Sequence, residues 1–370
     1  MARVTISRGA DEAPGGGDAQ DVVPTLANAR KQRQPVPGGA AIIAAVAIVI
    51  IAVFQLQIPY FAITPGPAPD VLRLIDISGV RTKPVTGHLL LTTVSLHEVR
   101  VAEAIRGWFD SNYEIVSRSA IIPSGETVQD AEQRTTLQMD ESQEHAAAAA
   151  LALLGYEVKI TPIGARVAEL VPGAPATKVL HRGDLIVGAD AAQIRKSEEL
   201  KAIISRHKVG DEITLKIVRG SDRITLKTKT AGNPEDPTKP IIGVLLDNVP
   251  SVKLPLAVDI ESLGIGGPSA GLMYALGIVD LLDSSDLTHG RTIAGTGAIT
   301  IDGTVQPVGG IRQKVGAARS AGAQLFVAPL VELRDACSRA GDLPVIGVEH
   351  LKDAVAALRG TPVPPERMCN

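Results

Sequence analysis

The longest uninterrupted apolar stretch of the chain lies near its N-terminus, over residues 40–54. Residues 1–37 before it are rich in Gly, Pro, Ala and Asp without apolar periodicity, which predicts a disordered tail. Extended to Ile58, the stretch reaches about 19 residues, or roughly 28 Å as a helix, and so just spans a bilayer core. We therefore predict one transmembrane helix within residues 38–60, in contact with the lipid bilayer.

Charge around this stretch predicts its orientation. Arg30, Lys31 and Arg33 precede it, and the nearest basic residue after it is Arg73. Positive charge favours the cytoplasmic side, so we expect a single-pass protein of the cell membrane with a cytoplasmic N-terminus and extracytoplasmic C-terminal domains. A cleaved signal peptide is the alternative; the long leader and the lack of a clear A-x-A site favour an uncleaved anchor.

The pattern after the anchor predicts three further regions. Residues 61–150 form an extracytoplasmic α/β region with a strand at 88–94 and helices at 96–109 and 130–154. Residues 151–230 form a small β-rich module with short helices, ending in a hairpin of strands 213–218 and 223–228. Residues 231–237 have the composition of a linker, and residues 238–359 alternate apolar strands with helices, which predicts an α/β or α+β domain. Residues 360–370 form a C-terminal tail.

A candidate nucleophile stands where a glycine-rich turn meets an apolar helix. Pro268 suits the first helical position, because its fixed φ is helical and its missing N–H costs nothing there. Ser269 then lies in the first turn, near unpaired N–H groups and the positive end of the helix dipole. The same geometry can stabilise an oxyanion beside a nucleophilic hydroxyl.

A serine nucleophile needs a base, and Lys314 is the candidate. It lies in the first turn of a helix predicted from Ile311 to about Ala321, at the edge of its apolar face. Burial and a positive helix end both disfavour the charged ammonium. Both therefore lower the pKa of the lysine toward the range that a general base needs.

These residues resemble the motifs of Lon-type serine proteases. Gly267-Pro268-Ser269-Ala270-Gly271 looks like the nucleophile motif, and residues 293–314 are similar to the second Lon motif. The spacing of the two candidates, 314 − 269 = 45 positions, also suits that family. Two positions depart from it: Gly266 and Ala298 stand where family members with an ATPase usually or often carry an acid.

The resemblance implies a serine endopeptidase in which Ser269 attacks the peptide carbonyl and neutral Lys314 takes its proton. Backbone N–H groups around Gly267, Pro268 and Ser269 are candidates for the oxyanion hole, and Thr296 is a candidate for orienting the lysine. A rival triad would use His289 with a nearby aspartate, but residues 286–290 read as an exposed loop. A catalytically silent adaptor, in which the Lon-like domain is only a scaffold, is the alternative of a different class.

The β-rich module at 151–230 strongly resembles a bacterial PDZ domain. The resemblance implies that an extended C-terminus adds to the sheet as a strand, with its carboxylate against a turn of backbone N–H groups. We place that turn near Ile163, Gly164 and Ala165. The alternative is a groove that is filled internally, in a module that only packs or gates.

Composition narrows the partners. The net charge of −3 implies no nucleic-acid binding, and no P-loop motif occurs, so we expect no ATP dependence and loose, unfolded or damaged polypeptide substrates. No cofactor or metal site is expected, because no metal-ligand spacing occurs. Lon-type domains commonly assemble into rings, so the resemblance allows a homo-oligomer. A disulfide between Cys337 and Cys369 could form outside the cytoplasm; two unpaired thiols are favoured, because Cys369 lies in a tail expected to fray.

Overall fold

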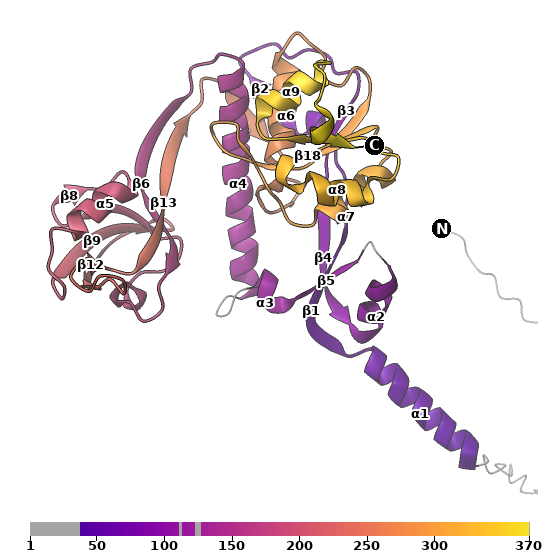
Figure 1. The fold of residues 1–370 in the computed structure, drawn as a ribbon, viewed down its shortest axis with the longest axis horizontal. Helices are drawn as coiled ribbons and strands as arrows, with labels where there is room; N and C mark the ends of the chain where they lie inside the picture. The colour runs from indigo at the N-terminus through magenta and orange to yellow at the C-terminus, as the bar shows by residue number, and fades with distance from the viewer. Residues whose placement is uncertain (1–37, 111–112, 123–126, 370) are drawn as a thin grey trace, which may run out of the picture. The chain divides into compact units, whose positions relative to one another are not determined.

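The computed structural model of the chain describes residues 38–110, 113–122 and 127–369 (Figure 1). The described residues divide into two units, with the boundary between residues 53 and 54. The predicted tail at 1–37 lies outside the described residues. The α-helices are α1 Gly38–Phe54, α2 Val101–Phe109, α3 Arg118–Ile121, α4 Val128–Leu153, α5 Ser197–Ile204, α6 Gly271–Leu282, α7 Ile311–Ser320, α8 Leu333–Ala340 and α9 Leu351–Leu358.

The strands fall into several sheets and are bounded as follows: β1 Gln57–Pro65, β2 Ile75–Ser78, β3 His88–Leu91, β4 Val94–Arg100, β5 Glu114–Ser117, β6 Lys159–Leu170, β7 Leu185–Ala189, β8 Ala192–Gln193, β9 Glu212–Arg219, β10 Asp222–Lys229, β11 Ala231–Gly232, β12 Pro240–Ile241, β13 Val244–Lys253, β14 Ala257–Ile260, β15 Thr292–Gly295, β16 Ala298–Ile299, β17 Val305–Gln306, β18 Leu325–Pro329, β19 Val345–Val348 and β20 Met368–Cys369.

The predicted transmembrane helix is wrong. Helix α1 ends at Phe54 after 17 residues, and the chain becomes extended at Gln57, where β1 begins. At about 1.5 Å per residue this is roughly 26 Å, short of the predicted span. Among the described residues, every helix is too short or too polar to cross a bilayer. Three predictions rested on that helix: a single-pass location in the cell membrane, its orientation, and contact with the bilayer. These predictions are wrong for the same reason.

The C-terminal part of the chain is built around a five-stranded sheet of order β20-β19-β18-β15-β3. Strands β3, β15, β18 and β19 are parallel, and only β20 is antiparallel to its neighbour. Helix α6 is buried along almost its whole length, because apolar Leu, Met, Ala, Ile and Val side chains lie on every face of the helix. These elements position the candidate nucleophile, which lies just before α6.

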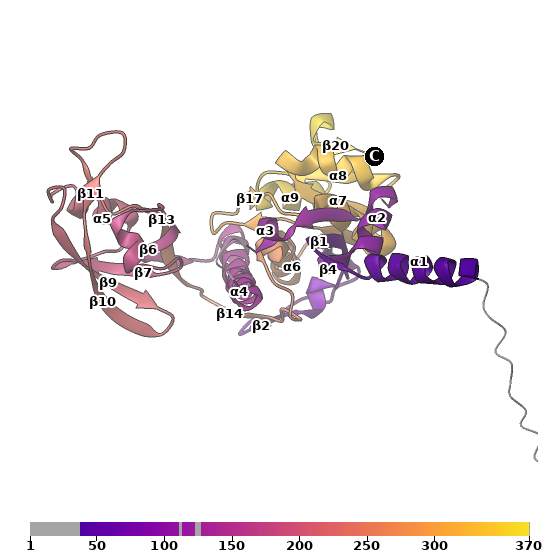
Figure 2. The same ribbon diagram turned by 90° about the horizontal axis from the view of Figure 1, so that it is seen from below.

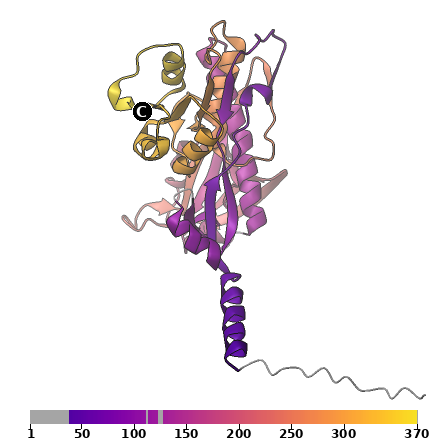
Figure 3. The ribbon, with the colours of Figure 1, turned by 90° about the vertical axis from the view of Figure 1, so that its right-hand side faces the viewer.

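Residues 61–150 do not form a separate unit, in contrast to the prediction. Strand β3 pairs with β15 inside the five-stranded sheet, and β2 pairs with β14. Buried residues of α4 share one apolar core with those of α6. Figure 3 shows the early, purple strands within the same body as the orange and yellow C-terminal segments. The body that holds the five-stranded sheet therefore contains chain from both sides of the β-rich module.

The helix predicted over residues 96–109 is wrong for its first residues and confirmed for the rest. Residues Val94–Arg100 form β4, which pairs with β1 in a three-stranded sheet of order β4-β1-β5. Helix α2 begins only at Val101, where the Glu103 carboxylate accepts a hydrogen bond from the Arg100 N–H at 3.0 Å. Pairing with β1, distant in sequence, overrides the local helical pattern. The helix predicted at 130–154 is confirmed as α4.

The β-rich module forms one sheet of order β10-β9-β7-β6-β13, with β8 beside β7 (Figure 2). The predicted hairpin is confirmed, since β9 and β10 pair in register around Gly220. The predicted boundary after residue 237 is wrong, because β13 pairs along its length with β6 and so completes this sheet. Strand β13 is then followed by β14, which belongs to the body that holds the five-stranded sheet.

Cys337 and Cys369 form a disulfide, with Cα atoms 6.1 Å apart. The expected pair of free thiols is therefore wrong. The expectation rested on a frayed C-terminal tail, but residues Met368–Cys369 fold back as β20 and pair with β19. This pairing brings Cys369 beside α8, which carries Cys337.

Candidate active site

The turn before α6 holds Ser269 in a fixed conformation. Gly267 has φ +87°, in the left-handed region that glycine tolerates best, and Pro268 follows at the first position of a short 3₁₀ helix, Pro268–Ala270. Ser269 is half-buried. Its carbonyl oxygen accepts two hydrogen bonds, from the Gly297 N–H at 2.9 Å and from the Thr296 hydroxyl at 3.0 Å.

Lys314 lies in the first turn of α7, as the sequence predicted. The helix starts after Gly310, whose φ of +68° is left-handed. Ile311 and Val315 are buried on the predicted apolar face, and Lys314 itself is only 2% exposed. The helix therefore carries its lysine into the protein interior rather than into solvent.

Thr296 connects the two candidates. It follows β15 and is fully buried. Its hydroxyl oxygen accepts a hydrogen bond from the Lys314 ammonium nitrogen at 3.0 Å and donates its own hydrogen to the Ser269 carbonyl at 3.0 Å. Ser269 and Lys314 thus touch the same threonine, although 45 positions separate them in the chain (314 − 269).

Burial lowers the pKa of Lys314 from 10.5 to about 8, because an ammonium loses its hydration in the interior. The negative charge of Glu332 acts in the opposite direction and raises this pKa. Near pH 8 a substantial fraction of Lys314 is therefore neutral and able to accept a proton.

Glu332 is a residue that sequence reasoning missed. Its carboxylate accepts a hydrogen bond from the Val308 N–H at 2.9 Å, which holds the turn just before α7. Burial raises the pKa of Glu332 above its ordinary value. The Val308 hydrogen bond and the charge of Lys314 lower this pKa, but they offset the effect of burial only in part. No motif marks this residue, because it lies just before α8, and its contact with the turn before α7 forms only when α7 and α8 pack together in the fold.

The predicted oxyanion donors need correction. The Gly267 N–H donates to the Thr135 carbonyl of α4 at 2.8 Å, so it is already engaged. Pro268 has no N–H to donate. The Ala270 N–H belongs to the i→i+3 bonding of the 3₁₀ helix Pro268–Ala270, and the Gly271 N–H donates to the Pro268 carbonyl. Within this turn, which the structure describes in full, the Ser269 N–H therefore remains as the backbone donor beside the hydroxyl.

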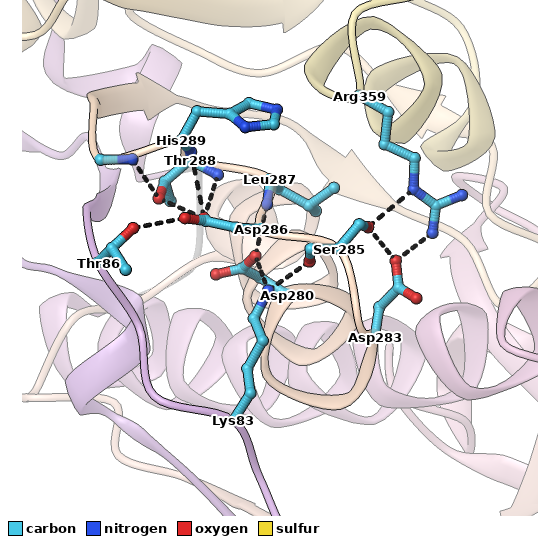
Figure 4. Close-up of polar contacts among 11 residues, drawn as sticks. Lys83, Thr86, Asp280, Asp283, Ser285, Asp286, Leu287, Thr288, His289 and Arg359 are labelled. Carbon is cyan, nitrogen blue, oxygen red and sulfur yellow. Dashed lines mark hydrogen bonds and ion pairs between the residues drawn. The ribbon is translucent and has the colours of Figure 1, made fainter.

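The His289 alternative is not supported by the geometry of its loop. Figure 4 shows the imidazole pointing away from the Asp286 carboxylate. That carboxylate instead accepts hydrogen bonds from the Thr288 hydroxyl at 2.7 Å, the His289 N–H at 3.1 Å and the Thr86 hydroxyl. Burial raises the pKa of Asp286, but these bonds outweigh it and lower the pKa to about 2. The aspartate thus stabilises a turn.

The predicted peptide-binding turn is also misplaced. Gly164 and Ala165 lie inside β6, opposite Val249 and Asn248 of β13, and Ile163 lies beside them in the same strand. A different turn precedes β13, at residues 242–243. Its two carbonyls accept hydrogen bonds from N–H groups of the segment after β6, at 3.2 and 3.0 Å.

This second turn requires glycine. Gly243 has φ +80°, and a Cβ there would lie 2.1 Å from the Ala174 Cβ. Strand β13 is the end strand of its sheet, and its Asn248 amide oxygen accepts a hydrogen bond from the N–H of Ser197, the first residue of α5, at 2.6 Å. Within the described residues, then, β13 has a strand partner on one side and contacts α5.

No group of three or more His, Cys, Asp or Glu side chains with a geometry suited to a metal ion occurs in the part of the chain that the structure describes. We identify no residues there that would hold a cofactor.

Comparison with known proteins assigns the two domains. Residues 259–356 match the Lon protease (S16) C-terminal proteolytic domain, and residues 137–230 match a PDZ domain. The chain therefore contains a proteolytic domain of the serine protease class together with a PDZ domain. The first match covers β14 to α9, including Ser269, Thr296 and Lys314.

Particular relatives agree with this class. The chain is 38% identical over 93 residues to Lon protease 1 of Herpetosiphon aurantiacus, a stretch that is 24% of this chain and 11% of that protein. It is 46% identical over 63 residues to the Lon protease of Desulforamulus reducens, covering 17% of this chain and 8% of the relative. The chain thus spans about a tenth of the length of these relatives.

Among solved structures, the PDZ domain of an SdrC-like protein from Listeria monocytogenes is similar. It shares 31% sequence identity, covers 24% of this chain and 92% of its own, and gives a TM-score of 0.22.

Proposed function

We propose that this chain is an ATP-independent serine endopeptidase of unfolded or damaged polypeptides, with Ser269 as nucleophile and Lys314 as general base. The observation that carries the proposal is the buried lysine beside the nucleophile turn, with its lowered pKa and its contact with Thr296. Burying a lysine is costly for stability, and perturbed groups of this kind cluster at functional sites.

In the proposed mechanism, the Ser269 oxygen attacks the peptide carbonyl while neutral Lys314 accepts the hydroxyl proton. The tetrahedral oxyanion is stabilised by the N–H group of Ser269. The protonated lysine then gives its proton to the leaving amine, and the C–N bond breaks. Water then attacks the acyl-enzyme while Lys314 accepts its proton. The bond between the acyl carbon and the Ser269 oxygen breaks, Lys314 returns the proton to that oxygen, and the second product leaves as a carboxylic acid.

Thr296 has a supporting role in this scheme. Its hydroxyl restrains both the lysine nitrogen and the carbonyl of the nucleophile. The lack of a P-loop motif in the chain supports cleavage without ATP, and therefore substrates that are already unfolded.

The pH dependence of cleavage tests the general base. Lysine is a base only when neutral, so below the folded pKa of about 8 most molecules are inactive, and above it the activity approaches a plateau. We expect kcat/KM for a quenched, unfolded protein substrate to fall about tenfold per pH unit below about pH 7, without added ATP. A rate that is flat across this range would contradict Lys314 as the base, and a rate that requires ATP would contradict ATP independence.

We also propose that the PDZ domain binds an extended C-terminus along β13, with the terminal carboxylate at the Ile242–Gly243 turn. The support is the position of β13 at the end of its sheet, next to α5, and the left-handed glycine in the turn before it. Such binding would recruit polypeptides to the proteolytic domain.

Peptide affinity of the full chain tests this proposal. Peptides with a free C-terminal carboxylate should bind in fluorescence anisotropy, and the same peptides as C-terminal amides should bind at least about tenfold more weakly. Gly243→Ala should weaken binding, since it strains the turn and collides with Ala174. Gly220→Ala is the matched control, because its φ is +59° but no atom lies within 4 Å of the added Cβ. Equal affinity for acid and amide would favour a module that only packs or gates.

A further inference from the structure

Helix α4 contacts the nucleophile turn directly, although it lies more than a hundred residues earlier in the chain. The Ser142 hydroxyl donates to the Pro268 carbonyl at 2.8 Å, and the sequence separation is 126. About two turns earlier on the same helix, the Thr135 carbonyl accepts the Gly267 N–H at 2.8 Å. Ser142 is only 2% exposed, so its hydroxyl is committed to this contact.

The sequence of the turn is adapted to this close approach. A Cβ at position 266 would lie 2.8 Å from the Thr135 hydroxyl oxygen, and a Cβ at position 271 would lie 2.7 Å from the Ser142 hydroxyl oxygen. Both positions are glycine. The contact with α4 therefore gives a physical reason for Gly266, the position at which this chain departs from the acid that family members with an ATPase usually carry.

The geometry of one peptide group links Ser142 to the chemistry. The Pro268 carbonyl and the Ser269 N–H belong to the same planar trans peptide unit, in which they point in opposite directions. A hydrogen bond that holds the carbonyl therefore also fixes the direction of the N–H. The Gly271 N–H donates to the same carbonyl, so Ser142 supplies a second, lateral restraint.

The next peptide group is restrained in the same way. The Ser269 carbonyl accepts from Thr296 and Gly297, which fixes the direction of the Ala270 N–H. Two neighbouring N–H groups are thus aligned from two sides: one by Ser142 of α4, the other by the segment after β15. With the Gly267 N–H engaged by α4 and the Ala270 N–H engaged in the 3₁₀ helix, the Ser269 N–H is the donor left between Gly267 and Gly271.

We propose that Ser142 is a positioning residue of the protease, which aligns the Ser269 N–H as an oxyanion donor by holding the carbonyl of the same peptide group. This inference rests on the proposed function. Ser142 touches neither substrate nor the reacting hydroxyl, and it acts only through the orientation of one peptide plane.

The test compares Ser142→Ala with the wild-type full chain. We expect kcat to fall about tenfold to a hundredfold with KM unchanged, less than the ~10²–10³ lost when an oxyanion donor is deleted outright. A peptide boronate forms a tetrahedral adduct with an activated serine, and its inhibition constant should weaken by the same factor as kcat/KM. The apparent pKa of the rate profile should stay unchanged, since the lysine is untouched.

Two further variants separate positioning from folding. Ser142→Cys keeps most of the volume but donates poorly, so it should lose activity like Ser142→Ala even if the alanine variant folds badly. Thr136→Ala is the control on the same helix, because its exposed hydroxyl donates to the Glu132 carbonyl of α4 itself. It should leave kcat and boronate affinity unchanged.

The possible outcomes separate failure of the positioning role of Ser142 from failure of the proposed protease function. Wild-type cleavage with unchanged kcat in both folded Ser142 variants would overturn the positioning role alone. A kcat loss without a matching loss of boronate affinity would also overturn it, because the oxyanion site would then be intact. No cleavage by the wild type would overturn the proposed function, and this inference with it.

Discussion

Replacing Ser269 by alanine is expected to reduce cleavage of an unfolded protein by at least about 10⁴-fold, to the background of the assay. Lys314→Met should have a similar effect, because it keeps the volume of the buried side chain but removes the proton acceptor. Since the two groups act as one unit, the double variant should be no slower than either single variant. The measurement is the initial rate with a quenched fluorescent substrate at a pH above the lysine pKa.

The matched control is His289→Ala, which should stay within about threefold of the wild type, because the Asp286 carboxylate bonds to backbone and threonine groups instead of the imidazole. Activity that survives Lys314→Met but is lost in His289→Ala would move the base to the histidine. Full activity of Ser269→Ala in an assay of cellular function, without any cleavage by the wild type, would favour the adaptor.

The second large effect concerns stability. Asp280 of α6 is fully buried. Its carboxylate forms an ion pair with the Lys83 ammonium at 2.9 Å and accepts a hydrogen bond from the Leu287 N–H at 2.8 Å (Figure 4). Lys83→Met would leave a buried carboxylate without its counter-charge. We expect the free energy of unfolding to fall by about 3–5 kcal/mol, measured by urea denaturation.

Two companion variants define this result. Lys83→Met combined with Asp280→Asn should recover part of the loss, because asparagine still accepts from Leu287 and carries no charge. Lys239→Met removes an exposed partner of Asp236, 3.2 Å away, and should leave the urea midpoint almost unchanged. A loss for Lys83→Met as small as that for Lys239→Met would show that the buried pair contributes little.

Most features of the candidate site that could be predicted follow from local sequence motifs. Pro268 and the apolar residues after Ser269 predict a helix that begins at Pro268; the structure has a 3₁₀ helix there and starts α6 at Gly271. The apolar face around Ile311 and Val315 predicts a buried Lys314, which the structure has. These features depend on neighbouring residues, so periodicity and helix-start preferences are sufficient to find them. The role of the two side chains in catalysis stays a proposal.

What escaped prediction depends on contacts between distant segments. Nothing near Ser142 indicates that its hydroxyl meets Pro268, since α4 reads as an ordinary helix with no chemistry of its own. The pairing of β13 with β6 joins residues on both sides of a predicted linker. The return of Met368–Cys369 as β20 likewise brings together two cysteines that the sequence places in different elements.

The measurement that tests the central claim most directly is the site of covalent labelling by a β-lactone, which acylates an activated hydroxyl as its ring opens. After reaction with the full chain, peptide mass mapping should find one adduct, on Ser269. Its rate of formation should rise with pH through about 8 and be far slower in Lys314→Met. An adduct on another residue, or equally fast labelling of Ser269 in Lys314→Met, would contradict the proposed pair.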